Sequence, residues 1–269
     1  MSYTYYIPFI SEYCRNFKPA NIVEIGTEYG TSFIGLTHQL MTKGVEFNLC
    51  GIDVLIRPSF DATLQMIPRN IDTQRISLIE CNSLEILHHL LEPDRIGTTS
   101  EDRLLVESPL HVALVDGDHN YYTVDKELQT IDKYSSPLTL IICDDYNTRH
   151  ATKDMFYAER DTHAHIEGKG LTQRADSEKV GVRPAVDDFL AANPRWKKLR
   201  DPSGLTPDGC LLYREDNDIF KGYRQRRLDL PAEIRKTQLA VSVAGSRWGW
   251  TGKDADHLLK TLKDLFPDE

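Results

Sequence analysis

The sequence lacks long apolar runs, paired cysteines and a secretory signal. No run approaches the roughly 18 apolar residues that a membrane helix requires, and Met1 to Ile7 has neither the basic nor the apolar region of a signal peptide. We therefore expect no membrane contact and a cytoplasmic location. The 5 cysteines include no Cys-x-x-Cys pair, so we expect reduced, buried thiols and no disulfide framework.

Basic residues are also few. The chain has 32 Lys and Arg against 41 Asp and Glu, a formal net charge of −9. This balance disfavours nucleic acid as a partner, because phosphate contacts need clustered basic side chains. With 269 residues, 40% of them hydrophobic, the chain can form one large α/β core with appendages.

Short apolar runs alternate with helical or polar stretches along the chain. The predicted strands are 22–25, 47–53, 76–80, 112–115, 138–143, 196–199 and 210–213. The first five are short and apolar, as strands covered by helices on both faces are. The last two flank a turn-rich connector, which favours an antiparallel hairpin. The predicted fold class is α/β, with a doubly wound, mostly parallel seven-stranded sheet, an antiparallel edge hairpin and a C-terminal helical extension.

The sequence predicts a division of the chain into three segments. We expect an N-terminal helix in residues 1–19, a core domain over 20–214, and a C-terminal extension over 215–269 that ends in a helix. Within the core, residues 146–180 form a long polar stretch that we interpret as a lid or substrate-recognition insertion, with a plain surface insertion as the alternative. The apolar faces of the first and last helices make a homodimer a further hypothesis.

The first predicted strand leads into a turn that begins at Gly26 and ends at Gly30, before a helix. Such a turn lets a ligand approach the backbone closely, and the amino end of a helix favours a carboxylate or phosphate. The G-x-G-x-x-G spacing is missing, so a nicotinamide cofactor is not expected. Asp53 ends the second strand, where an acidic residue can meet ribose hydroxyls. Asn82 and Ser83 follow the third strand and are suited to lining an adenine pocket.

Two acidic clusters close the fourth and fifth predicted strands. The first contains Asp116, Asp118 and His119, and the second is the pair Asp144 and Asp145. Carboxylates gathered at neighbouring strand ends can hold a divalent cation, which lowers the pKa of a bound hydroxyl while a nearby base accepts its proton. His119 and Asp116 are both candidates for that base. Acidic residues at strand ends also cap helices, and this structural interpretation stays open for each of them singly.

With these motifs the chain resembles the class I S-adenosylmethionine-dependent methyltransferases, and within them the metal-dependent small-molecule O-methyltransferases of the macrocin and mycinamicin type. The resemblance spans about residues 20 to 214. Its motifs are Glu24-Ile-Gly-x-x-x-Gly30-x-Ser32, Gly51-Ile-Asp53, Asn82-Ser83, Asp116-Gly-Asp-His-x-Tyr121, Asp144-Asp145-Tyr146 and Gly181-Val-x-x-Ala185-Val-Asp187.

The resemblance implies a cofactor, a metal and a set of site residues. The implied S-adenosylmethionine-binding residues are Glu24, Gly26, Thr27, Gly30, Ser32, Asp53, Asn82, Ser83 and Asp116. A magnesium ion, or another divalent cation, would be held by Asp116, Asp144 and Asp145, with His119 near the substrate hydroxyl. Asn82 stands where the family usually has an acidic residue, and its side-chain oxygen can still accept from an adenine amine.

The function that these features predict is metal-assisted O-methylation of a hydroxyl on a small molecule of the sugar or natural-product type. One alternative is an enzyme like the cephalosporin hydroxylases, with the same fold and metal cluster but with a need for an oxidant and a reductant. Another is a non-catalytic module that binds S-adenosylmethionine without any effect of metal.

Overall fold

The computed structural model describes residues 6–56, 58, 60, 76–91, 109–154, 178–199 and 208–225. These residues contain a single seven-stranded sheet with the order β3-β2-β1-β4-β5-β7-β6. The strands are β1 (Ala20–Ile25), β2 (Phe47–Asp53), β3 (Ile76–Glu80), β4 (Leu110–Val115), β5 (Ser135–Cys143), β6 (Trp196–Lys198) and β7 (Cys210–Arg214).

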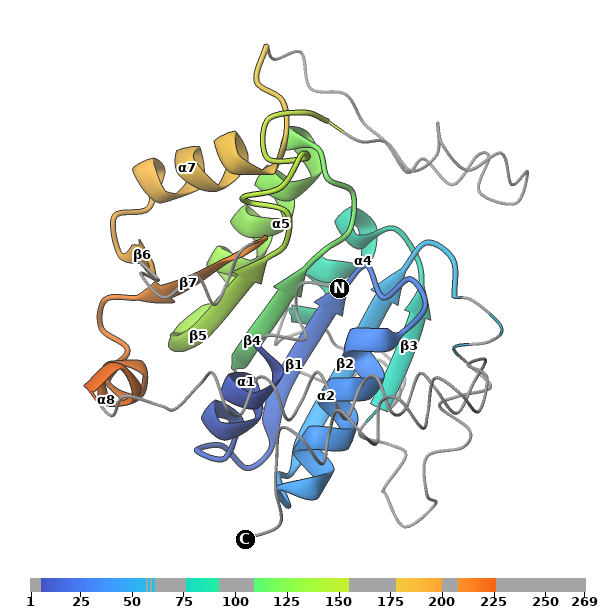
Figure 1. The fold of residues 1–269 in the computed structure, drawn as a ribbon, viewed down its shortest axis with the longest axis vertical. Coiled ribbons are helices and arrows are strands. Elements are labelled where there is room, and N and C mark those ends of the chain that lie inside the picture. The colour runs from blue at the N-terminus through green and yellow to red at the C-terminus, as the bar shows by residue number, and fades with distance from the viewer. Residues whose placement is uncertain are drawn as a thin grey trace, which may run out of the picture.

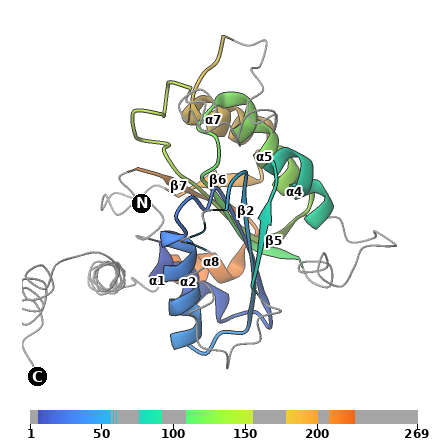
Figure 2. The same ribbon diagram turned by 90° about the vertical axis from the view of Figure 1, so that its right-hand side faces the viewer.

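Helices cover both faces of the sheet (Figures 1 and 2). The described helices are α1 (Ile7–Cys14), α2 (Thr31–Thr42), α4 (Ser83–Leu91), α5 (Tyr121–Lys133), α7 (Val182–Ala192) and α8 (Asp218–Gln225). Helices α1, α2 and α8 lie on one face, and α4, α5 and α7 lie on the other, as the view in Figure 2 shows. This is the layered arrangement expected of a doubly wound fold.

The strand directions confirm the predicted fold class. Strands β3, β2, β1, β4 and β5 run parallel to one another, whereas β7 runs antiparallel to both β5 and β6. The order reverses between β1 and β4, because β2 and β3 lie on one side of β1 and the later strands on the other. In open α/β sheets ligands bind at the carboxyl ends of strands beside such a reversal.

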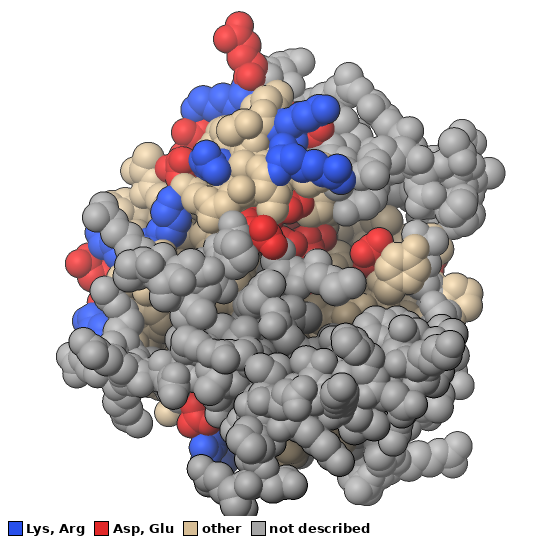
Figure 3. All heavy atoms as spheres, viewed as in Figure 1, with Lys and Arg blue, Asp and Glu red and all other residues tan. Residues whose placement is uncertain are grey.

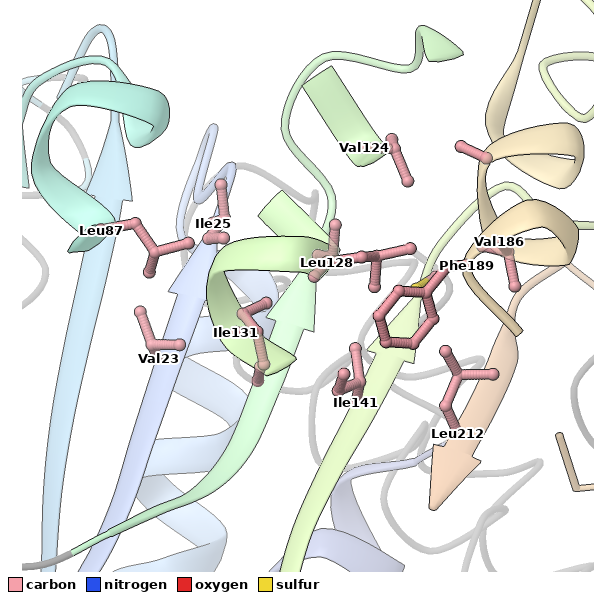
Figure 4. Close-up of a cluster of buried hydrophobic side chains, with 14 of the residues drawn as sticks. Val23, Ile25, Leu87, Val124, Leu128, Ile131, Ile141, Val186, Phe189 and Leu212 are labelled. Atoms are coloured by element: carbon pink, nitrogen blue, oxygen red, sulfur yellow. The ribbon is translucent and has the colours of Figure 1, made fainter. Parts of the chain in front are cut away.

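Alternate residues of each central strand belong to two separate hydrophobic cores. Val23 and Ile25 of β1 pack in the core under α4, α5 and α7, which Figure 4 shows together with Leu128 of α5 and Phe189 of α7. Ile22 packs in the other core, with residues of α1, α2 and α8. Burial on both faces explains why the strand sequences are apolar throughout and show no alternation.

Several predicted elements differ in extent from the structure. The leading helix is shorter than its apolar pattern suggested and covers only Ile7–Cys14, while β5 begins three residues early, at Ser135. Cys81 is partly exposed, unlike the other cysteines, which are buried. Within the described part of the chain, no helix is long and apolar enough to cross a membrane.

Two parts of the sequence-based division fall largely outside the described residues. Of the predicted insertion over 146–180, the structure describes 146–154 and 178–180. The predicted terminal helix lies beyond residue 225 and is not described. Helix α8, which follows β7, was not predicted, because its residues are mostly polar; its Phe220 is nevertheless 2% exposed.

Candidate active site

The turn after β1 depends on two glycines with left-handed backbone angles. Gly26 has φ of +81°, and a Cβ atom there would lie 1.9 Å from the carbonyl oxygen of Asp116. Gly30 has φ of +74° and precedes α2, and a Cβ there would lie 2.2 Å from the ring of Phe60. Both angles are costly for residues with a side chain. The start of the turn therefore packs directly against the backbone of Asp116, at the end of β4.

Glu24 lies in the middle of the sheet directly before this turn. Its side chain is fully buried, and one carboxyl oxygen accepts a short hydrogen bond from the hydroxyl of Ser32 in α2. The other oxygen, Oε2, is buried and has no hydrogen-bond partner among the described residues. Burial raises the pKa of Glu24 to about 8, against the opposing effect of the Ser32 hydrogen bond. The site thus holds a carboxyl group with capacity for one further donor.

Asp53, at the carboxyl end of β2, ties the first two strand loops together. Its Oδ2 accepts from the backbone N–H of Glu28 at 2.7 Å and from the hydroxyl of Thr27 at 3.4 Å. Its Oδ1 accepts from the N–H of Leu55 at 3.0 Å. Each carboxylate oxygen can accept two hydrogen bonds, so Oδ1 retains one acceptor position. The residue predicted to bind ribose lies where the sequence placed it, beside the glycine turn.

Asn82 and Ser83 begin α4 after the end of β3. The side-chain oxygen of Asn82 accepts from the N–H of Leu84 at 2.9 Å, which makes it a cap of the helix. The hydroxyl of Ser83 is buried and donates to Oε1 of Glu127 at 2.5 Å. Glu127 is not among the site residues predicted from the sequence. Its position within the apolar pattern of Val124 and Leu128 in α5 was the one signal that could have revealed a buried carboxyl group.

Asp116 and Asp144 end the neighbouring strands β4 and β5 with their carboxyl groups close together. Burial, the nearby charges of Asp144 and Asp145, and contact with the Asp144 carboxyl raise the pKa of Asp116 well above its usual range. Asp144 is 5% exposed, and its Oδ1 has no hydrogen-bond partner among the described residues. Asp116 is partly buried, with 22% of its side chain exposed. Two carboxyl groups in contact, one of them buried, favour a shared proton or a bound cation.

His119 and Asp145 form a second pair beside this one. Nδ1 of His119 lies 2.8 Å from Oδ2 of Asp145, and Nε2 lies 3.6 Å from Oδ1 of Asp116. The hydroxyl of Thr148 donates to the other Asp145 oxygen at 2.6 Å. Although burial opposes it, the hydrogen bonds from His119 and Thr148 and the charges of His119 and His150 lower the pKa of Asp145. The lowered pKa keeps Asp145 ionised, as the acceptor of a hydrogen bond from Nδ1 of His119.

The backbone of this second pair is fixed by unusual geometry. Asp145 has φ of +55°, in the left-handed region that non-glycine residues rarely occupy. The ring of His119 stacks on that of His150, with centroids 5.2 Å apart and an angle of 28° between the planes. Residues of the segment after β5 therefore hold His119 from two sides.

The predicted metal ligands are brought to one edge of the sheet, but their side chains do not all converge. In the described part of the chain, no group of three or more His, Cys, Asp or Glu side chains is arranged to hold a metal ion. Asp116 and Asp144 face each other, whereas Asp145 is directed to His119 and Thr148. The buried, unpartnered oxygen of Asp144 fits a divalent cation, which binds carboxylate oxygen. Figure 3 shows acidic side chains exposed at this edge with basic ones beside them.

The comparison with protein families agrees with this architecture. Residues 23–146 match the family model of a methyltransferase domain. The segment includes the glycine turn, Asp53, Ser83 and both acidic clusters, and its sheet has the strand order of the class I fold. Residues 23–146 of this chain therefore match a methyltransferase domain, and they lie in a Rossmann-like α/β sheet.

Solved structures with a similar backbone are also methyltransferases. The Podospora anserina methyltransferase PaMTH1 with bound S-adenosylhomocysteine is 16% identical, with a TM-score of 0.42 over 78% of this chain and 77% of that one. The TDP-rhamnose 3'-O-methyltransferase CalS11 is 14% identical, with a TM-score of 0.48 over 78% and 77%. The mycinamycin-pathway methyltransferase MycE is 12% identical, with a TM-score of 0.43 over 79% of this chain and 50% of its own. A search of curated protein sequences gives no match.

Proposed function

We propose that this protein is an S-adenosylmethionine-dependent O-methyltransferase that acts, with the help of a divalent cation, on a hydroxyl group of a small molecule of the sugar or natural-product type. The observation that carries the proposal is the pairing of His119 with Asp145 beside the contacting carboxyl groups of Asp116 and Asp144. Both pairs lie at the carboxyl edge of the sheet, next to the glycine turn. A base, an acidic cation site and a cofactor turn are the parts that hydroxyl methylation needs.

The cofactor would occupy the crevice between the β1 and β4 ends. The turn from Gly26 to Gly30 would receive its methionine end, where the buried Oε2 of Glu24 can accept from a ligand amine. Asp53 retains an acceptor position for a ribose hydroxyl. Because the backbone of Asp116 lies against Gly26, the cofactor and the acidic cluster would be immediate neighbours.

Asp116 and Asp144 would hold the cation. Asp145 was predicted from the sequence as a third ligand, and this role stays a prediction. A bound divalent cation supplies the Lewis acidity that lowers the pKa of a hydroxyl and fixes its position. The chain's own contribution is a pair of carboxyl groups in contact, without a lysine or arginine partner in the described residues.

His119 is the better candidate for the base. Asp145 accepts from Nδ1 of His119, which fixes the ring with Nε2 on the side of Asp116, 3.6 Å from its Oδ1. The raised pKa of Asp116 favours its protonated form, which makes it the weaker candidate. Asp145 and Thr148 orient the imidazole and would stabilise its protonated form, as a carboxylate partner does in other histidine-based sites.

Calorimetric titration tests the proposal. S-adenosylmethionine is titrated into the wild-type protein with magnesium and with a chelator, and magnesium is titrated into wild type, Asp144→Ala/Asp145→Ala and the control Asp125→Ala, which changes a carboxylate of α5 away from the strand ends. We expect micromolar cofactor binding in all proteins and loss of the magnesium heat in the double variant alone.

Three results would count against the proposal. Absence of cofactor binding removes the methyltransferase function. Cofactor binding without any magnesium heat in the wild type removes the metal and leaves His119 alone to activate the hydroxyl. Turnover of a hydroxyl substrate that requires an oxidant and a reductant, with no methyl transfer, would identify the hydroxylase alternative.

A further inference from the structure

Glu127 is a fully buried carboxyl group that the proposed mechanism does not use. It lies in the second turn of α5, is 0% exposed, and forms no ion pair with a lysine or arginine among the described residues. Its Oε2 has no hydrogen-bond partner among them either. Burial raises its pKa to about 8, with the Ser83 hydrogen bond opposing and the charge of Asp118 adding to the effect. Burying such a group costs folding free energy unless its contacts compensate for the loss of water.

The contacts of Glu127 connect two strand loops at the cofactor edge. Its Oε1 accepts the hydroxyl proton of Ser83, at the start of α4, at 2.5 Å. The same oxygen would lie 3.3 Å from a Cβ atom built on Gly117, in the loop after β4. The hydrophobic side chains on either side of it, Val124 and Leu128, lie in the core shown in Figure 4. Packing of α5 therefore fixes the position of this carboxyl group.

The hydrogen bond determines what Ser83 can offer to a ligand. A serine hydroxyl has one proton to donate and two lone pairs to accept with. Because Oε1 of Glu127 receives the proton, the Ser83 oxygen can act toward a further group only as an acceptor. The neighbouring acceptor, the side-chain oxygen of Asn82, already caps α4 through the N–H of Leu84 at 2.9 Å. The buried Glu127 side chain thus determines whether the Ser83 hydroxyl donates or accepts a hydrogen bond toward a ligand.

We infer that Glu127 is a specificity-determining residue that holds Ser83 as a hydrogen-bond acceptor for the exocyclic amino group of the cofactor's adenine. This inference rests on the proposed use of S-adenosylmethionine. Adenine is then the favoured base. A base with a carbonyl oxygen in place of the exocyclic amino group would direct a hydrogen-bond acceptor at the acceptor oxygen of Ser83. Glu127 acts through Ser83 and is a positioning residue with no contact to the ligand of its own.

Binding of two ligands that differ only at this position tests the inference. The probes are S-adenosylhomocysteine and its hypoxanthine analogue, which carries oxygen in place of the amino group. A hydrogen bond to a buried acceptor contributes on the order of 1 kcal/mol, and a mismatch adds a desolvation penalty, so the wild type should bind the adenine compound roughly tenfold or more tightly.

Four variants distinguish a change in the hydrogen-bonding role of the Ser83 hydroxyl from an effect on folding. Glu127→Leu removes the acceptor and should reduce the preference for adenine to about twofold or less, because the Ser83 proton can then turn to the ligand. Glu127→Gln keeps an acceptor oxygen and should retain the preference. Ser83→Ala should lose both affinity and preference. Gln129→Leu, an exposed change on the same helix, should behave as the wild type, and thermal unfolding shows whether each variant is folded.

The outcomes distinguish this inference from the proposed function. If the wild type binds neither compound, the cofactor assignment fails and the inference fails with it. If the wild type binds S-adenosylhomocysteine but a folded Glu127→Leu protein keeps the full preference, the inference alone is overturned. Equal loss of preference in Glu127→Leu and Glu127→Gln would also overturn it, because that result indicates a general packing effect.

Discussion

The buried carboxyl group of Glu24 should make the stability of this protein depend on pH. Its pKa is raised from 4.5 to about 8, chiefly by burial. In the unfolded chain the group ionises near the lower value, so between the two values the folded protein holds a proton that the unfolded chain releases. For a group whose pKa is raised on folding, stability is greatest below the unfolded pKa and falls as pH rises through the folded one.

The magnitude follows from the gap between the two pKa values. Each pH unit within the gap costs roughly 1.4 kcal/mol of folding free energy, so the full effect is on the order of 5 kcal/mol. Between pH 5 and pH 7, the loss should be roughly 3 kcal/mol for Glu24 alone. Glu24→Gln cannot ionise and keeps an oxygen that can accept from Ser32, so it should lack this part of the pH dependence.

Urea unfolding at pH 5, 6, 7 and 8 measures the effect as the difference in unfolding free energy between Glu24→Gln and the wild type. Between pH 5 and pH 7 the difference should shift in favour of the variant by roughly 1.4 kcal/mol for each pH unit, and by less near pH 8. Glu46→Gln, which changes an exposed glutamate, is the matched control and should parallel the wild type. If the curve for Glu24→Gln also runs parallel to that of the wild type, the argument from burial is refuted. The comparison is unaffected by Glu127, which titrates in the same range in all three proteins.

Three other changes test separate parts of the structure. Gly26→Ala places a Cβ 1.9 Å from the Asp116 carbonyl at a left-handed angle, so it should destabilise the fold by more than about 1 kcal/mol and abolish cofactor binding; unchanged thermal stability would contradict the close approach. Phe220→Ala removes a ring that is 2% exposed and lies 4.4 Å, between centroids, from Tyr213, and should cost roughly 3–5 kcal/mol in denaturant unfolding; a cost below about 1 kcal/mol would mean that α8 contributes little. Asp145→Asn removes the charge that holds His119, so methyl transfer should fall at least tenfold; unchanged turnover in the variant would remove Asp145 as the partner of the base.

The sequence by itself determined the order and type of the main elements. Short apolar runs such as 22–25 and 138–143 predicted buried parallel strands, since a strand covered on both faces has no polar side. The turn from Gly26 to Gly30 was also readable, because left-handed backbone angles favour glycine at fixed places. These are local properties, and the periodicity and composition of a few residues carry them. The positions of the acidic residues at strand ends followed in the same way, since parallel strands end at one edge.

Only the tertiary structure decided which side chains meet at that edge. The predicted cluster separates into the Asp116–Asp144 pair and the His119–Asp145 pair, and this division depends on side-chain directions after β4 and β5 that no local pattern encodes. Glu127 reaches Ser83 across 44 residues of sequence because α5 packs beside α4. Helix α8 is polar in sequence and is held by the contact of Phe220 with Tyr213 and Phe9. Contacts between residues distant in the chain arise from the packing of whole elements, so they are absent from any window of sequence.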